Sequence, residues 1–99
     1  MRKIVLLCSF GMSTSLLVTR MQEAAAAQSY DCEIEATSIA EVANVADTAD
    51  ILLLGPQVRF QRGKVEEQAS CPVEVIEATA YGRMDGEAVI AKVKEILGD

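Results

Sequence analysis

Apolar and polar residues follow one another along the chain in blocks that predict strands and helices in turn. Two short runs, residues 4–7 and 51–54, contain only large aliphatic side chains. Such runs, when loop residues bound them, are typical of parallel strands that are buried on both faces. Residues 32–37 alternate apolar and charged positions, which indicates a strand at the edge of a sheet, and residues 72–76 form a fourth short apolar segment.

Helical patterns lie between these strands. The predicted helices cover residues 16–28, 39–45, 61–69 and 87–97. Ser38 and Asp85 are suited to cap the second and fourth of them. Strands that alternate with helices predict a single α/β domain with a four-stranded parallel sheet, right-handed crossovers and helices on both faces. We expect the strand order 2-1-3-4, which places the two uninterrupted apolar runs at the centre of the sheet.

Length and charge narrow the range of functions. Ninety-nine residues, of which 51% are apolar, make one domain with a hydrophobic core. No apolar run reaches the roughly 18 residues that a membrane span needs, and the start of the chain does not read as a signal peptide, so we expect a soluble cytoplasmic protein. A net charge of −6 with no basic tract argues against nucleic-acid binding. Because the chain contains no histidine, a partner must supply any phosphohistidine.

The candidate chemistry lies at Cys8, where the first apolar run ends. A short polar segment, residues 9–15, separates it from the first predicted helix, and Gly11 gives that loop conformational freedom while Ser13 or Thr14 can cap the helix. Loop amides and the helix dipole together favour a bound anion. The same field stabilises a thiolate, so Cys8 is expected to be a good nucleophile at neutral pH. A nucleophilic sulfur in a phosphate-binding loop is suited to forming a thiophosphate ester. The simpler alternative is that Cys8 is a buried cysteine with a packing role only.

The other two cysteines, Cys32 and Cys71, are interpreted as packing residues. No pair of cysteines has CxxC spacing, which argues against a zinc or thioredoxin-like site, and we expect neither a metal nor a disulfide.

The loop lacks one residue that a phosphatase would need. Small cysteine phosphatases use the pattern Cys-x5-Arg-Ser/Thr, but the sixth position after Cys8 is Thr14. Arginine is suited to bidentate recognition of a phosphate in a way that a hydroxyl is not. The loop is therefore expected to hold a phosphoryl group and to hydrolyse it poorly, which is what a phosphoryl carrier requires.

Three segments, CSFGMSTSLLV (8–18), LLLGPQV (52–58) and PVEVIEATAYGRMDG (72–86), resemble the IIB component of the bacterial sugar phosphotransferase system, in its lactose/cellobiose family. The resemblance runs through essentially the whole chain. It implies an architecture similar to that of small cysteine phosphatases and flavodoxins, a phosphorylated Cys8 and no cofactor. It also implies a phosphate-binding loop made of Ser9, Phe10, Gly11, Met12, Ser13, Thr14 and Ser15. Phe10 departs from the small residue expected there, which alters the docking surface but removes no backbone amide.

The resemblance also implies the partners. A phosphohistidine on a IIA protein donates to Cys8, and phospho-Cys8 donates to a sugar bound by the membrane protein IIC. The expected sugar is cellobiose or another β-linked disaccharide, and the expected state is a monomer that forms transient complexes. Gln57 and Tyr81 are candidates for the rim of the site, each with a purely structural alternative. Arg59 and Arg62 are either docking or phosphate-assisting residues or, as the favoured interpretation, ordinary surface charges.

Two other functions fit parts of the pattern. A small cysteine phosphatase or an arsenate reductase would also use Cys8, although the missing arginine and the lack of an evident Asp-Pro loop argue against both. A non-enzymatic module that binds a phosphate-bearing cofactor would use residues 13–15, with Cys8 incidental, although the few aromatic residues argue against a flavin.

Overall fold

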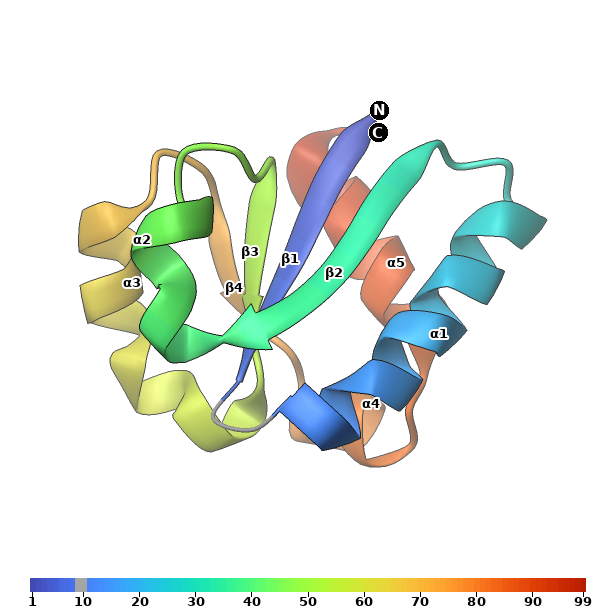
Figure 1. Ribbon diagram of the computed structural model, residues 1–99. Helices are drawn as coiled ribbons and strands as arrows, with labels where there is room; N and C mark the ends of the chain where they lie inside the picture. The colour runs from blue at the N-terminus through green and yellow to red at the C-terminus, as the bar shows by residue number, and fades with distance from the viewer. Residues whose placement is uncertain (9–10) are drawn as a thin grey trace.

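A four-stranded sheet separates two layers of helices in the computed structural model (Figure 1). The structure describes residues 1–8 and 11–99, and for residues 11–13 it describes the backbone alone. Its elements are β1 (Arg2–Cys8), α1 (Gly11–Ala27), β2 (Cys32–Ser38), α2 (Val42–Val45), β3 (Ile51–Leu54), α3 (Arg62–Gln68), β4 (Val73–Val75), α4 (Ala78–Gly82) and α5 (Gly86–Leu97). Two 3-10 helices, η1 (Ile39–Glu41) and η2 (Pro56–Gln61), precede α2 and α3.

The sheet has the order β2-β1-β3-β4 and all its pairings are parallel, which confirms the predicted topology. The two aliphatic runs form the central strands β1 and β3, whose registers place Leu7 beside Leu54. Because the strands are parallel, all four end at the same edge of the sheet. Cys8 is the last residue of β1 and pairs with Ser38, the last residue of β2.

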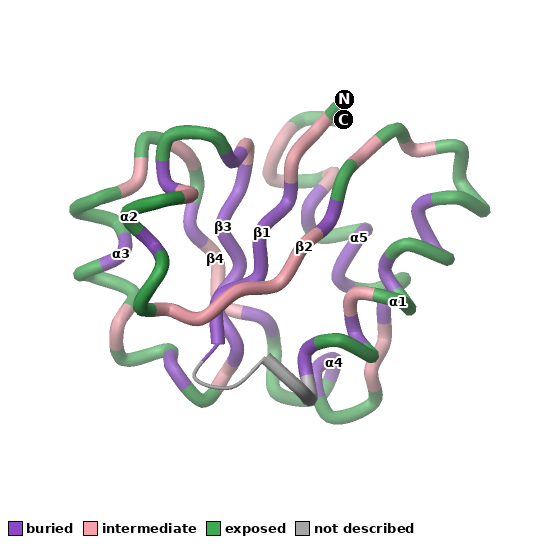
Figure 2. Tube along the Cα trace, viewed as in Figure 1, coloured by how far each residue is buried: buried purple, intermediate pink, exposed green. Residues whose placement is uncertain are grey.

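Each central strand sends alternate side chains into two separate cores, since successive residues of a strand face opposite ways. The core beneath α1 and α5 contains Ile4, Leu6, Leu17, Met21, Ile51, Leu53, Ile90 and Val93. The core beneath α2, α3 and η2 contains Val5, Leu7, Val42, Leu52, Leu54, Val58, Val65 and Val73. In Figure 2 the strands β1 and β3 are accordingly buried along most of their length, while the outward faces of the helices are exposed.

The helices α1 and α5 pack against each other at a glycine. Gly86 is the first residue of α5, and a Cβ atom there would lie 2.3 Å from the carbonyl carbon of Arg20 and 2.5 Å from the backbone nitrogen of Met21. Only a residue without a side chain allows this approach. The preceding Asp85 caps α5 by accepting a hydrogen bond from the Ala88 amide at 3.1 Å, as predicted.

The two ends of the chain meet at the edge of the sheet opposite Cys8 (Figure 1). The Arg2 guanidinium donates two hydrogen bonds of 2.8 Å to the Asp99 carboxylate, and the Tyr30 hydroxyl donates a third at 2.6 Å. These donors, Arg2 first, lower the pKa of Asp99 to about 2. Burial, followed by the hydrogen bond to Asp99, raises the pKa of Tyr30.

The outer edge of β4 is closed by side chains rather than by a further strand. Arg62 donates to the carbonyl of Val73 at 3.0 Å, and Glu74 accepts from the amide of Val75 at 3.2 Å. Arg62 and Glu74 also approach each other at 3.7 Å. Two of the backbone groups that could pair with a foreign strand, the Val73 carbonyl and the Val75 amide, are therefore occupied.

Three segments differ from the predicted elements. Helix α1 begins at Gly11 rather than Leu16, so residues 11–15 are helical and not loop. The segment after β4, which lies outside the predicted helices, forms the short helix α4. A 3-10 turn, η2, fills the space between β3 and α3, with Pro56 as its first residue because proline needs no amide hydrogen there.

Candidate functional site

The chain turns from β1 into α1 at the edge of the sheet where the strands end (the lower edge in Figure 1). Only two residues, Ser9 and Phe10, separate Cys8 from the first residue of α1. In open α/β sheets this edge is where ligands bind, and here it lies beside β1 with β2 on one side and β3 on the other. The sequence therefore places Cys8 at the expected position for a functional residue.

Cys8 is buried among hydrogen-bonding groups rather than among apolar side chains alone. The Thr14 hydroxyl donates to the Cys8 sulfur at 2.9 Å, and the two residues are 1% and 2% exposed. The Cys8 thiol lies 3.9 Å from the Thr37 carbonyl of β2, a long contact for a weak sulfur donor. A hydroxyl that donates to sulfur favours the negatively charged thiolate, which is the nucleophilic form of cysteine.

The start of α1 adds a second source of positive potential. This helix has 17 residues, and its first turn contains no acidic residue that would offset the helix dipole. The first turn of any α-helix leaves backbone N–H groups without partners inside the helix, and these groups favour a nearby anion. Because α1 starts three residues after Cys8, the Cys8 residue lies near the positive end of the helix.

Gln57, a candidate for the rim of the site, lies near Cys8. The amide of Gly55 donates to the Leu7 carbonyl at 3.0 Å, which brings the start of η2 against the end of β1. A Cβ atom on Gly55 would lie 2.7 Å from the Gln57 Oε1 atom and 3.7 Å from the Cys8 Cβ atom. The exposed Gln57 amide is therefore within reach of a group attached to the Cys8 sulfur.

Two residues at this edge were not predicted as part of the site. Gly55 allows η2 to approach Cys8 because it has no side chain, and Thr37 contributes only a backbone carbonyl. Gly55 could have been identified from the sequence, because it is a glycine directly after a buried strand. Thr37 could have been inferred from the predicted pairing of the strands at residues 4–7 and 32–37.

Of the remaining predicted site residues, the structure describes the side chains of Tyr81 and Ser15 but not those of residues 9–13. Tyr81 is 8% exposed and belongs to the core beneath α1 and α5, which gives it a packing role, while its place at the rim stays a prediction. Ser15 is exposed on α1. Ser9 and Phe10 lie outside the described residues, and the side chains of residues 11–13 are not described either. Their binding of phosphate stays a prediction.

The other two cysteines have different surroundings. Burial raises the pKa of the Cys32 thiol, with Asp31 adding to the shift, and burial together with Asp50 raises the pKa of the Cys71 thiol. Both are therefore thiols rather than thiolates at neutral pH. In the described part of the chain, Cys8, Cys32 and Cys71 form no disulfide bond.

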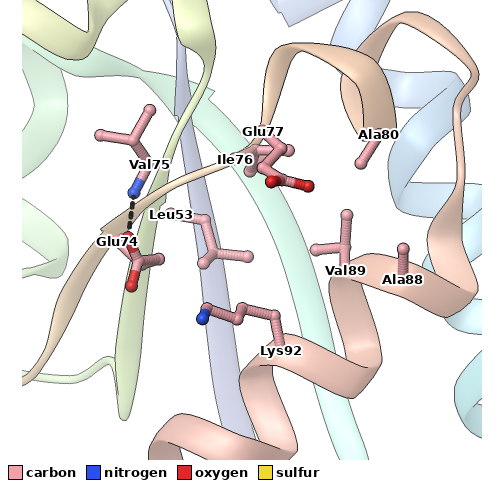
Figure 3. A pocket seen from close by; sticks show the side chains of 9 residues that line it. All are labelled: Leu53, Glu74, Val75, Ile76, Glu77, Ala80, Ala88, Val89 and Lys92. Atoms are coloured by element: carbon pink, nitrogen blue, oxygen red, sulfur yellow. Dashed lines mark hydrogen bonds between the residues drawn. The ribbon is translucent and has the colours of Figure 1, made fainter.

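A cavity of about 310 Å³ lies elsewhere, between β4, α4 and α5 (Figure 3). Its floor is apolar, with Leu53, Ile76 and Val89, while Glu77 and Lys92 stand at its mouth. Neither Cys8 nor Thr14 lines it. Within residues 1–8 and 11–99 no three potential ligands gather as a metal site would require, and the same residues contain no helix with the length and apolarity to cross a membrane.

Comparison with known proteins identifies the family. The sequence model described as "PTS system, Lactose/Cellobiose specific IIB subunit" matches residues 3–92. The chain belongs to the lactose/cellobiose-specific IIB family of the phosphotransferase system. Members of this family are phosphotransferase components, so the protein is an enzyme component of sugar uptake, as the sequence resemblance implied.

Two relatives are equally similar to the chain and have different sugar names. The galactose-specific EIIB component of Lactococcus lactis subsp. cremoris (strain MG1363) is 43% identical over 102 residues, covering 95% of this chain and 94% of the relative. The cellobiose-specific EIIB component of Lactococcus lactis subsp. lactis (strain IL1403) gives the same identity and coverage. The solution structure of a cellobiose-specific IIB protein from Borrelia burgdorferi superposes with a TM-score of 0.81 at 35% identity, covering 98% of this chain and 92% of the other.

Proposed function

We propose that this IIB protein is a phosphoryl carrier in which Cys8 is the residue that becomes phosphorylated. The observation that carries the proposal is the buried hydrogen bond of 2.9 Å from the Thr14 hydroxyl to the Cys8 sulfur. A cysteine that only packs needs no hydroxyl donor, whereas a thiolate nucleophile is stabilised by one. The raised pKa values of Cys32 and Cys71 support the choice of Cys8 among the three.

In the first half-reaction the Cys8 thiolate attacks the phosphorus of a phosphohistidine on the IIA partner. The S–P bond forms as the N–P bond breaks, and the histidine nitrogen leaves. Amides of residues 9–13, up to the first turn of α1, then hold the phosphoryl oxygens while the charge is redistributed, with the α1 dipole in support and Gln57 as an additional donor. Because the acceptor is a thiolate, the transfer needs no base on this chain.

In the second half-reaction a sugar hydroxyl attacks the phosphorus of phospho-Cys8. The S–P bond breaks and returns its electron pair to sulfur, so the leaving group is again the Cys8 thiolate. The Thr14 hydroxyl is placed to stabilise the developing charge on that sulfur, in the same way as it stabilises the resting thiolate. The proton of the sugar hydroxyl must go to a base on the partner that binds the sugar.

We propose that the acceptor sugar is bound by a membrane IIC protein, that it is cellobiose or another β-linked disaccharide, and that the transfers take place in the cytoplasm. The sugar names of the relatives differ at equal identity, which fits a carrier that does not itself select the sugar. No cofactor or metal has a role in the proposed steps. The protein acts as a monomer that meets its two partners in turn.

The proposal is tested by reconstituting sugar phosphorylation from phosphoenolpyruvate, the general phosphotransferase proteins, a IIA protein and membranes that contain IIC. Cellobiose phosphate should form only when the chain is added, and Cys8→Ala should abolish its formation. The double variant Cys32→Ala/Cys71→Ala is the matched control and should keep most of the activity. Full activity of Cys8→Ala, with loss in the control, would overturn the assignment.

A further inference from the structure

Two large apolar side chains are exposed on elements that start at the Cys8 edge of the sheet. Phe60 in η2 is 78% exposed and Leu16 in α1 is 49% exposed, whereas the third exposed large apolar residue in the described chain, Met1, lies at the opposite edge. Aromatic residues are enriched in protein–protein interfaces, and a phenylalanine exposed to this degree contributes little to its own fold. Phe60 is therefore a candidate anchor for a partner that approaches Cys8.

The charge around Phe60 is opposite to that of the protein. Residues 55–64 contain three basic residues and no acidic one, in a chain with a net charge of −6. Arg59 is held along η2 by a hydrogen bond of 3.0 Å to the Pro56 carbonyl. Within the described part of the chain neither Arg59 nor Lys64 forms an ion pair, so both charges face outward unneutralised.

We infer that η2 and the first turn of α3, with Phe60 at the centre and Arg59 and Lys64 beside it, form the docking surface for the phosphoryl donor protein. This inference rests on the proposed function of Cys8. The partner it fits has an acidic surface with an apolar recess for Phe60, next to the phosphorylated histidine. The contact between Gly55 and Leu7 attaches this surface directly to the Cys8 end of β1, so docking here brings the donor to the sulfur.

Charge distinguishes the donor from the membrane acceptor. The donor carries its phosphoryl group as negative charge toward an unphosphorylated Cys8, and a basic surface favours that approach. After transfer the negative charge resides on Cys8 and offsets the basic surface, which favours release of the donor. Cytoplasmic loops of membrane proteins, in contrast, are enriched in lysine and arginine, so they match this surface poorly.

The experiment measures the two half-reactions separately in Phe60→Ala and Arg59→Glu. The first is the single-turnover rate of phosphoryl transfer from a charged IIA protein to the chain, as a function of chain concentration and salt. The second is transfer from the isolated phosphorylated chain to cellobiose in membranes that contain IIC. Lys92→Glu, on α5 in the other helical layer, has the same change in net charge as Arg59→Glu and is the matched control.

Phe60→Ala should lower the second-order rate constant of the first half-reaction at least about tenfold, as expected for an aromatic anchor. Arg59→Glu should lower it about tenfold at low salt, and the loss should shrink as salt rises. Lys92→Glu should react as the native chain does, and the second half-reaction should be unchanged in all variants. Native first-step rates in both test variants, or equal losses in both half-reactions, would overturn the inference. Failure of the native chain itself to become phosphorylated would refute the proposed function instead.

Discussion

The hydrogen bond from Thr14 to Cys8 leads to a prediction about phosphoryl transfer from the charged chain. Thr14→Val removes the hydroxyl but keeps the shape of the side chain at a position that is 1% exposed. In the proposed second half-reaction the S–P bond breaks and negative charge develops on the Cys8 sulfur. The variant lacks the Thr14 donor that stabilises this charge, so the transfer should be slower.

The magnitude follows from the geometry. A buried hydrogen bond of 2.9 Å to a charged group contributes about 1.5–3 kcal/mol. Loss of this contribution in the transition state, where sulfur is the leaving group, should slow the transfer about 13- to 160-fold.

The assay is the single-turnover rate of transfer from the isolated phosphorylated chain to cellobiose in membranes that contain IIC. Thr14→Ser keeps a hydroxyl and is the control, with rates within about twofold of the native chain. Thermal unfolding of each variant checks that the fold is intact. The reasoning is refuted if Thr14→Val transfers its phosphoryl group as fast as the native chain does, or if Thr14→Ser shows the same loss as Thr14→Val.

Two further predictions concern the stability of the fold. Gly86→Ala should destabilise the protein by about 1–3 kcal/mol, because the new Cβ atom meets the backbone of α1. Gly63→Ala is the control and should stabilise the protein slightly, because Gly63 lies in α3 with open space around it. Equal unfolding midpoints in the two variants would contradict this reasoning. Asp99, whose pKa is held at about 2 chiefly by Arg2, stabilises the fold above its usual pKa of 3.8 and loses this effect as the pH falls through about 2. Asp99→Asn should therefore lower the melting temperature at pH 6, with a difference from the native chain that disappears toward pH 2, while Asp47→Asn in an exposed turn should lower it little at either pH.

The sheet could be predicted from the sequence because its signals are strong and local. The two aliphatic runs can be satisfied only by burial on both faces, which places β1 and β3 at the centre, as they are in the order β2-β1-β3-β4. The position of Cys8 at the functional edge then follows from its place at the end of β1. The proximity of Gln57 to Cys8 follows from the same parallel order.

The details of the site were harder to predict because they depend on tertiary contacts. Thr14 and Ser15 have modest helix propensity, so the sequence pattern placed them in a loop, but the hydrogen bond of Thr14 to Cys8 is made from within α1. The segment around Tyr81 lacks a clear helical period, and its helix is stabilised by the burial of Tyr81 in the core. The surface around Phe60 depends on exposure, which no sequence pattern gives.

The central claim is that Cys8 alone receives the phosphoryl group. The most direct test is the intact mass of the chain after incubation with phosphoenolpyruvate, the general phosphotransferase proteins and a IIA protein that is verified to be charged. The account predicts one added phosphate on the native chain and on Cys32→Ser/Cys71→Ser, and none on Cys8→Ser at neutral pH. An unmodified native chain in the presence of charged IIA, or an added phosphate that persists in Cys8→Ser, would contradict it.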